Sequence, residues 1–239
     1  MEDHDKKIRG ITKKLSGLQQ CVSEMETTET DLLTALGASA EGHGYTGADH
    51  LSLEIEHFLF VLANAVEARE QHTHGHIERV VNLTAALGGA FELPKEDARA
   101  LKMGSILHDI GKIGLPVHLL ANPGRLTPEE FEPIKNHPEI GYQICLPLKN
   151  HLGRALDIIR QHHEKLDGTG YPFGLKGDEI YLGARIMTVV DIYDALITDR
   201  PYRRGMSGET ALAILHQDAV DGKIDLDVVN SLAAFLGIC

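Results

Sequence analysis

Apolar residues recur at alternating steps of three and four along the first 36 residues of the chain. The positions that share this stripe are Ile8, Ile11, Leu15, Leu18, Val22, Met25, Leu32 and Leu36, with Glu29 in the one gap. A narrow stripe sustained over this length predicts a parallel two-stranded coiled coil, and therefore a homodimer. The alternative is a single amphipathic helix that packs on its own domain.

Residues 37–48 are rich in glycine and predict a break in the chain. We therefore expect an N-terminal helix and hinge at 1–48 and a second domain at 49–239. That domain carries helical patterns over 50–70, 74–87, 94–109, 138–146, 152–163, 181–197, 208–219 and 225–237, and a capping-box sequence at 127–130. Phe58 and Val66 are expected to be buried in the first of these helices. Strand-like alternation is missing, so the predicted fold class is all-α.

The composition fits a globular protein with an acidic balance. Of 239 residues, 43% are hydrophobic and 24% are charged, and the formal net charge is −12. Such a charge repels nucleic acid polymers and anionic membranes, so a phosphate substrate would need locally bound metal ions. The three cysteines are scattered, no apolar stretch is long enough for a membrane span, and no signal peptide is evident. These features predict a cytoplasmic protein.

The pair His108 and Asp109 lies on an apolar background, in the stretch Ile106–Lys112. Adjacent residues on a helix point about 100° apart, so they face one target only if the helix ends there. Gly111 is the expected stop signal. An unpaired buried aspartate would cost several kcal/mol, so Asp109 needs a cation. The alternative for the dipeptide alone is a capped helix end with an ordinarily hydrogen-bonded histidine.

Further histidines and aspartates stand at the ends or on the inner faces of other predicted helices. They are His76, His137, His162, His163 and Asp191, with His72 one turn before His76. Each alone fits a hydrogen-bonded core residue or an ion-pair partner. Together they form a nitrogen and oxygen ligand set suited to Fe, Mn, Zn, Co or Ni.

These residues divide into two expected metal sites. His76, His108, Asp109 and Asp191 could hold one ion, and His137, His162 and His163 could hold a second, with Asp109 bridging both. Two divalent ions keep such a centre cationic inside an acidic protein. They can also activate a bridging hydroxide for attack on phosphorus.

Two loops near the ligand set carry candidate substrate contacts. In 164–172 the glycines at 168 and 170 allow a sharp turn, and Tyr171 offers a ring and a hydroxyl. This loop is either a substrate wall or a surface loop with a buried tyrosine. Residues 200–204 are the densest basic cluster and could bind phosphate through Arg200 and Arg203. The alternative for this cluster is a solvated turn.

Three blocks in this order, HDIGK, HHEKLDGTGYP and DIYDALITDRPYR, resemble the HD-GYP family of metal-dependent cyclic dinucleotide phosphodiesterases. The resemblance covers roughly residues 70–235 and implies an all-helical HD-domain bundle. By motif position it implies the seven metal ligands His76, His108, Asp109, His137, His162, His163 and Asp191. It also implies phosphate contacts at Lys112, Arg200 and Arg203, and a nucleotide pocket and docking surface at Gly170 and Tyr171.

At one position this chain departs from the pattern of some family members. Some members hold three metals and carry a glutamate four residues before the first histidine ligand, where this chain has His72. A neutral imidazole would hold a third cation less well than a carboxylate. We therefore expect two divalent transition metals, with Fe or Mn favoured by the resemblance and a third ion at His72 as the alternative.

The resemblance implies hydrolysis of cyclic di-GMP to linear pGpG, and on to GMP in many members, with Asp109 and Lys112 at the catalytic centre. One alternative keeps the chemistry and changes the substrate to cyclic GMP-AMP. Another is a cyclic dinucleotide sensor or protein-docking module with little turnover.

Overall fold

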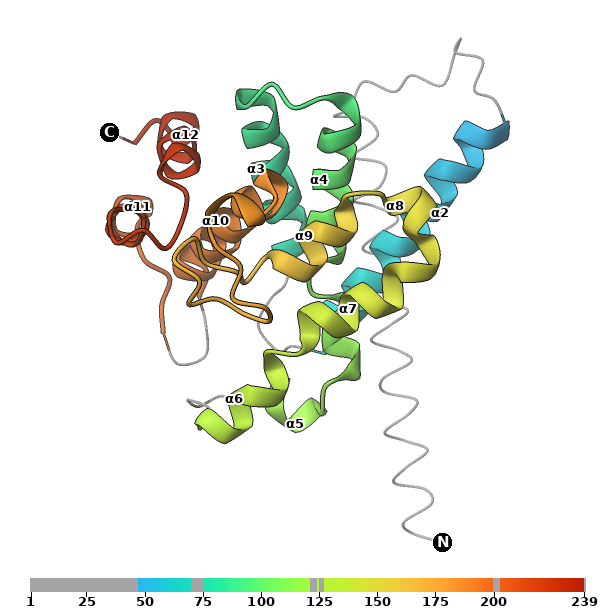
Figure 1. The fold of residues 1–239 in the computed structure, drawn as a ribbon, viewed down its shortest axis with the longest axis horizontal. Helices are drawn as coiled ribbons and strands as arrows, with labels where there is room; N and C mark the ends of the chain where they lie inside the picture. Colours follow the sequence, from blue (N-terminus) through green and yellow to red (C-terminus); the bar gives the residue numbers. More distant parts are fainter. Residues whose placement is uncertain (1–46, 70–74, 121–123, 125–126, 200–202, 239) are drawn as a thin grey trace, which may run out of the picture. The chain divides into compact units, whose positions relative to one another are not determined.

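The computed structural model of the chain describes residues 47–69, 75–120, 124, 127–199 and 203–238 (Figure 1). Apart from isolated β-bridge residues at Asp167, Lys176 and Arg203, every regular element in these residues is helical. The predicted all-α class is therefore confirmed. The longer helices are α2 (Gly47–Glu67), α3 (His76–Ala90), α4 (Lys95–Leu107), α7 (His137–Cys145), α9 (Ala155–Gln161), α10 (Leu182–Ile197), α11 (Gly208–Val220) and α12 (Leu226–Leu236).

Short helical turns link these helices. They are η1 (Ile110–Gly114), α5 (Val117–Leu120), α6 (Pro128–Ile134), η2 (Leu146–Leu148), α8 (Lys149–Leu152) and η3 (Gly177–Glu179). The expected capping box at the start of α6 is present, because Thr127 and Glu130 each bond the other's backbone nitrogen. None of the helices in the described ranges is both long and apolar enough to cross a bilayer.

Three local expectations are wrong. The helix α2 starts at Gly47, inside the segment predicted as a break. Phe58 on that helix is 66% exposed, whereas Val66 is buried as expected. The helix predicted over 152–163 is shorter than expected: α8 ends at Leu152, Gly153 adopts a positive φ of 51°, and α9 begins only at Ala155.

The chain divides into two units, Met1–Glu54 and Ile55–Cys239, and the site described below lies in the second. The apolar stripe over residues 8–36 lies outside the described residues. The coiled coil, the homodimer and the domain boundary at 48/49 therefore stay predictions.

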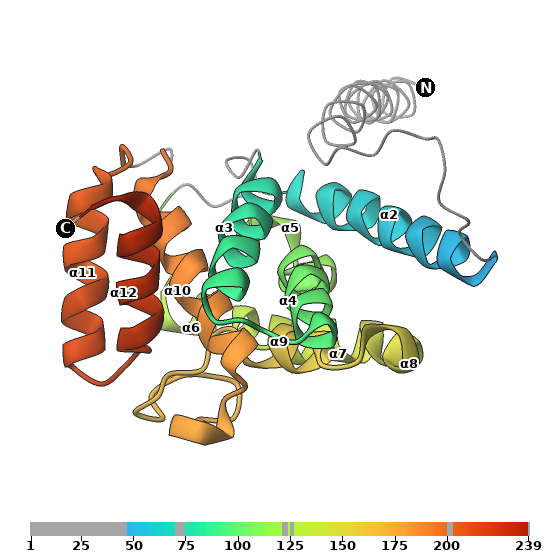
Figure 2. The same cartoon turned by 90° about the horizontal axis from the view of Figure 1, so that it is seen from above.

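The second unit has two apolar clusters that share three helices. One cluster joins α10, α11 and α12 to Val80 and Leu87 of α3, and the other joins α2 to α4 and α9. Figure 2 shows α11 and α12 side by side at one end and α3 and α4 together in the middle. Helices α3, α4 and α9 contribute buried residues to both clusters, so each of these helices is fixed by packing against both.

Candidate metal centre

Five histidines and two aspartates from five helical segments meet in the second unit. They form two groups whose ligand atoms lie within 4.8 Å of one another. One group is Asp109, His137, His162 and His163, and the other is His76, His108 and Asp191. The structure thus brings together all seven residues that were expected to be ligands. His72 lies outside the described residues.

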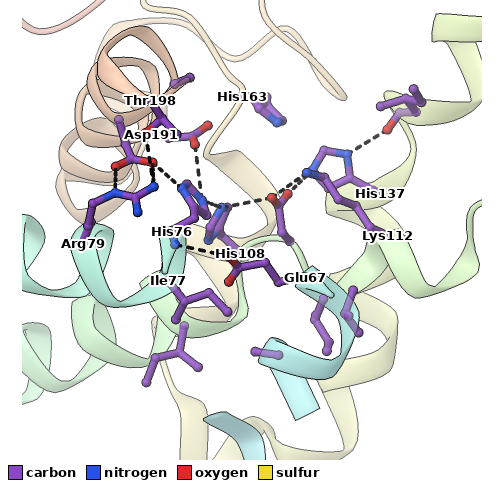
Figure 3. Close-up of a pocket in the computed structure, with 18 of the residues that line it drawn as sticks. Glu67, His76, Ile77, Arg79, His108, Lys112, His137, His163, Asp191 and Thr198 are labelled. Atoms are coloured by element: carbon purple, nitrogen blue, oxygen red, sulfur yellow. Dashed lines mark hydrogen bonds and ion pairs between the residues drawn. The ribbon is translucent and has the colours of Figure 1, made fainter. Parts of the chain in front are cut away.

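Helix ends supply most of these side chains (Figure 3). His76 and His137 begin α3 and α7, and His108 and His162 directly follow α4 and α9. The expected helix end at the His108 and Asp109 pair is confirmed, but Gly111 does not cause it, because α4 stops four residues earlier. Asp191 instead projects from the middle of α10.

Three of the histidines are oriented in the same way. In each, Nδ1 donates to the carbonyl oxygen of the residue three positions earlier. The bonds are His108 to Ser105 at 2.8 Å, His137 to Ile134 at 2.8 Å and His162 to Ile159 at 2.9 Å. A ring that is protonated at Nδ1 has a lone pair at Nε2, and this nitrogen faces the centre.

His76 is oriented by a carboxylate instead of a carbonyl. Its Nδ1 donates to Asp194 Oδ2 at 2.7 Å, and Arg79 donates to the same carboxylate from Nε at 2.6 Å and from Nη2 at 3.0 Å. Burial would raise the pKa of Asp194, but the bonds from His76 and Arg79 outweigh it and lower this pKa. Sequence reasoning missed both residues. The available signal was spacing, since Asp194 and Arg79 each follow a predicted ligand by three positions.

Pairs of imidazole nitrogens face each other at short distance. Nε2 of His76 lies 3.3 Å from Nε2 of His108, and Nε2 of His137 lies 3.2 Å from Nε2 of His162. Two lone pairs at this distance repel unless a cation lies between or beside them. This donor set fits divalent metal ions, and the described part of the chain therefore holds a His/Asp cluster that could bind them.

Asp109 stands between the two groups. Its Oδ1 lies 3.1 Å from His137 Nε2, and its Oδ2 lies 3.2 Å from His108 Nε2. Each oxygen therefore faces one group, which is the arrangement a bridging carboxylate requires. Burial would raise the pKa of Asp109, but the charges of Lys112 and His108 hold it well below its usual range.

Positive charge is favoured at one side of the cluster and excluded at the other. Burial lowers the pKa of His108, but the charge and hydrogen bond of Asp109 outweigh it and raise this pKa to about 9. Burial and the neighbouring histidines lower the pKa of His163 to about 3 and that of His162 well below its usual range. His162 and His163 are therefore neutral at physiological pH, as metal ligands must be.

The turn after Asp109 brings Lys112 back to the cluster. Lys112 Nζ lies 2.7 Å from Asp109 Oδ2. Arg69, just after α2, holds this turn by donating to the carbonyl oxygens of Ile113 at 2.8 Å and Leu115 at 3.0 Å. Gly111 serves close packing, because a Cβ there would overlap the His137 carbonyl oxygen and lie 2.5 Å from the nitrogen of Gly141.

The loop that holds Tyr171 is closed onto His163. The Tyr171 ring lies 4.7 Å from the His163 ring between centroids, and its amide donates to the His163 carbonyl. Glu164, which is 2% exposed, fastens the far side of the loop by accepting from the amides of Phe173 at 2.7 Å and Leu175 at 3.0 Å. Tyr171 is therefore a wall of the site rather than a remote surface residue.

Two cavities flank this wall. One, of about 280 Å³, is lined by side chains of both ligand groups and by Lys112. The other, of about 430 Å³, is lined by His163, Tyr171, Asp191 and Arg203 among others. Arg203 therefore lies beside the cluster, whereas Arg200 lies outside the described residues. Gly170 lies against the backbone of Glu164, where a Cβ would be 2.5 Å from Cα.

Comparison with known proteins places these features in a family. Residues 60–228 match the HD domain family. The chain is 39% identical over 156 residues to the cyclic di-GMP phosphodiesterase response regulator RpfG of Xanthomonas campestris, covering 65% of this chain and 41% of the relative. It is 38% identical over 172 residues to the 3'3'-cGAMP-specific phosphodiesterase 3 of Vibrio cholerae, covering 71% of this chain and 37% of the relative.

A solved structure gives the same result for the fold. The HDG"Y"P protein Bd1817 of Bdellovibrio bacteriovorus superposes with a TM-score of 0.59 at 25% identity, over 78% of this chain and 63% of that protein. The chain spans about two fifths of the length of the curated relatives named above. The matched residues include the whole ligand cluster and the loop of Tyr171. The chain therefore belongs to the HD domain family, and within it to the HD-GYP group that its motifs resemble.

Proposed function

We propose that the chain is a metal-dependent phosphodiesterase that hydrolyses cyclic di-GMP to linear pGpG, and further to GMP. One observation carries this proposal: two groups of imidazole nitrogens lie on either side of a shared carboxylate, Asp109. Relatives named as cyclic di-GMP phosphodiesterases support the substrate. A second candidate substrate is 3'3'-cyclic GMP-AMP, because another relative is named for it.

The proposed ligands are the seven residues of the two groups, with Asp109 shared. Two divalent cations bound there would activate water and polarise the phosphoryl oxygens. An all-nitrogen and oxygen donor set without thiolate suits Fe or Mn, and Zn, Ni or Co are compatible with it. A third ion would need His72.

The remaining residues would bind and orient the substrate. Lys112, which lies 2.7 Å from Asp109, is placed to neutralise charge on a phosphate at the cluster. Tyr171 and Gly170 would bound the nucleotide on one side, and Arg203 with Arg200 would contact phosphate on the other. The half-buried Tyr171, whose ring packs on His163, would also shield that side of the cluster from water.

The test is turnover by protein that is reconstituted anaerobically with each metal. Cyclic di-GMP and 3'3'-cyclic GMP-AMP are supplied in parallel, and products are resolved by chromatography beside measured metal content. We expect metal-dependent loss of a cyclic dinucleotide, and loss of both metal and activity in His108→Ala. Recovery of the bound dinucleotide unchanged from metal-loaded protein would identify a sensor instead of an enzyme.

Two further proposals concern assembly. We propose that residues 1–48 form a dimerising helix and hinge before a catalytic domain at 49–239, supported by the apolar stripe over 8–36. Analytical ultracentrifugation of proteins with and without residues 1–40 tests this, and a monomer in both cases contradicts it. The loop of Tyr171 is a proposed docking surface for a protein partner, supported by the 49% exposed ring of Phe173 beside it.

A further inference from the structure

The larger cavity beside the cluster is lined by two cationic side chains for which the described residues provide no salt bridge. Its lining includes Lys165 and Arg203, and the one carboxylate in that lining is Asp191. Asp191 belongs to the ligand group of His76, with its Oδ1 3.7 Å from His76 Nε2. Asp218, Asp167 and Asp191 act on Lys165 only through longer-range electrostatics, and neither cation forms a direct ion pair with a carboxylate of the described residues.

Arg203 shows this most directly. Its Nη2 donates to the carbonyl oxygen of Ala195 at 2.7 Å, which fixes the direction of the guanidinium. Its Nη1 is buried and has no hydrogen-bond partner in the described chain. A buried charged donor without an acceptor is costly, so a missing anion is the simplest explanation.

Lys165 lines the same cavity. Its backbone is fixed on both sides, because its carbonyl accepts from Gly168 at 2.8 Å and the next amide, of Leu166, donates to Lys223 at 2.8 Å. The Lys165 ammonium makes no hydrogen bond or ion pair with the described residues, although most of the side chain is covered. The sequence gives no reason for this, since the lysine reads as an ordinary loop residue.

The side chains of the three consecutive residues 163–165 thus face three different parts of the structure. His163 faces the metal cluster, Glu164 turns inward to fasten the loop, and Lys165 lines the second cavity. The cluster and the cationic cavity meet at His163, Tyr171 and Asp191, which line both cavities. A ligand with one phosphate at the cluster can therefore extend past Tyr171 into the second cavity.

We propose that Lys165, together with Arg203, binds the second phosphate of a cyclic dinucleotide while the first phosphate lies at the metal cluster. This inference rests on the proposed function and deepens it. A cyclic dinucleotide carries two phosphodiesters on opposite sides of one ring, so the phosphate that is not being cleaved must be placed somewhere. Lys165 is then a binding residue for substrates with two phosphates and makes no contact with a substrate that has one.

The experiment compares two substrates on the metal-loaded protein. Cyclic di-GMP has two phosphodiesters, and bis(p-nitrophenyl) phosphate has one. In Lys165→Met we expect kcat/KM for cyclic di-GMP to fall about ten- to hundredfold, mostly through KM, because one charge-assisted bond is lost. Turnover of bis(p-nitrophenyl) phosphate should stay within about twofold, since the cluster is untouched.

Two controls separate binding from structure. Lys165→Arg keeps the charge and should recover most of the affinity for cyclic di-GMP. Lys135→Met removes a lysine that pairs with Glu132 at 2.6 Å and lines neither cavity, and it should behave like the unaltered chain. Metal content is measured in every variant, so that a displaced His163 is recognised.

The outcomes distinguish this inference from the proposed function. Equal losses for both substrates in Lys165→Met, or no loss for cyclic di-GMP, overturn the inference while hydrolysis by the unaltered chain stands. If the unaltered chain binds cyclic di-GMP without cleaving it, the proposed function fails. The inference is then decided by calorimetry, which should show weaker binding in Lys165→Met. Absence of binding overturns both.

Discussion

Gly111 provides a sharp test of how the two ligand groups are held together. The Gly111 backbone lies directly against the first turn of α7, which carries His137. A Cβ at position 111 would overlap the His137 carbonyl oxygen and lie 2.5 Å from the backbone nitrogen of Gly141. Both neighbours are backbone atoms, so no side chain can rotate to relieve the overlap.

The size of the effect follows from these distances. Ordinary contact needs about 3.5 Å, so Gly111→Ala must move α7 away from the turn of Asp109 by more than about 1 Å, because the His137 carbonyl oxygen is closer still. We expect the free energy of unfolding to fall by about 3 kcal/mol or more, at the upper end of overpacking. Because His137 moves with α7, metal affinity of its group should also fall, by about tenfold or more.

Gly89→Ala is a matched control. Gly89 lies in α3, and a Cβ there would meet nothing within 4 Å. Removing a helical glycine at an open position should stabilise the protein by about 0.5–1 kcal/mol. Denaturant unfolding and metal titration are measured on both variants. A Gly111→Ala protein with unchanged stability and full metal content would refute the packing argument.

Three further predictions concern the supports of the cluster. In Asp194→Asn the side-chain NH2 must face a donor, either Arg79 or His76. Metal affinity at the His76 group should therefore fall about tenfold to a hundredfold, while the His137 group still binds metal. An unchanged metal titration contradicts this. Glu164→Gln replaces one acceptor oxygen with an NH2 group that faces the amide of Phe173 or Leu175. Amide hydrogen exchange in the loop of Tyr171 should therefore be faster. Equal protection in both proteins would refute the role of Glu164 in fastening this loop. In metal-free protein the lowered pKa of His163 means that the unfolded state binds more protons between about pH 3 and 6.5. The contribution of His163 to stability should therefore be fully present above about pH 6.5 and be lost as pH falls toward 3. Acid titration of thermal unfolding that shows no loss in this window would contradict it.

The convergence of the seven proposed ligands could be predicted from sequence because these residues conflict with their surroundings. Asp191 stands among apolar residues of α10, and His108 with Asp109 ends an apolar helix. A polar residue in such a position needs a partner, and several such residues imply a shared one. The helices themselves followed from their apolar periodicity, with errors only at their ends and at Gly153.

The supporting residues could not be predicted in this way. In the sequence, Arg79 and Asp194 look like ordinary surface residues. Only the packing of α3 against α10 pairs them and buries the Asp194 carboxylate to 2% exposure. Gly111 read as a helix stop, because the close approach of α7 is a tertiary event. Lys165 gave no signal at all, since a cavity is a property of the assembled helices.

Helix ends explain why Asp194 is needed at only one of the four buried ligand histidines. The last carbonyls of a helix have no intrahelical partner, and Ser105, Ile134 and Ile159 lie in the final turns of α4, α6 and α9. These spare acceptors bind Nδ1 of His108, His137 and His162, so no further side chain is needed to orient those rings. His76 begins a helix, where the spare backbone groups are N–H donors that cannot accept from Nδ1. A carboxylate from another helix must take that place, and so the orientation of this one ligand depends on α10 remaining packed against α3.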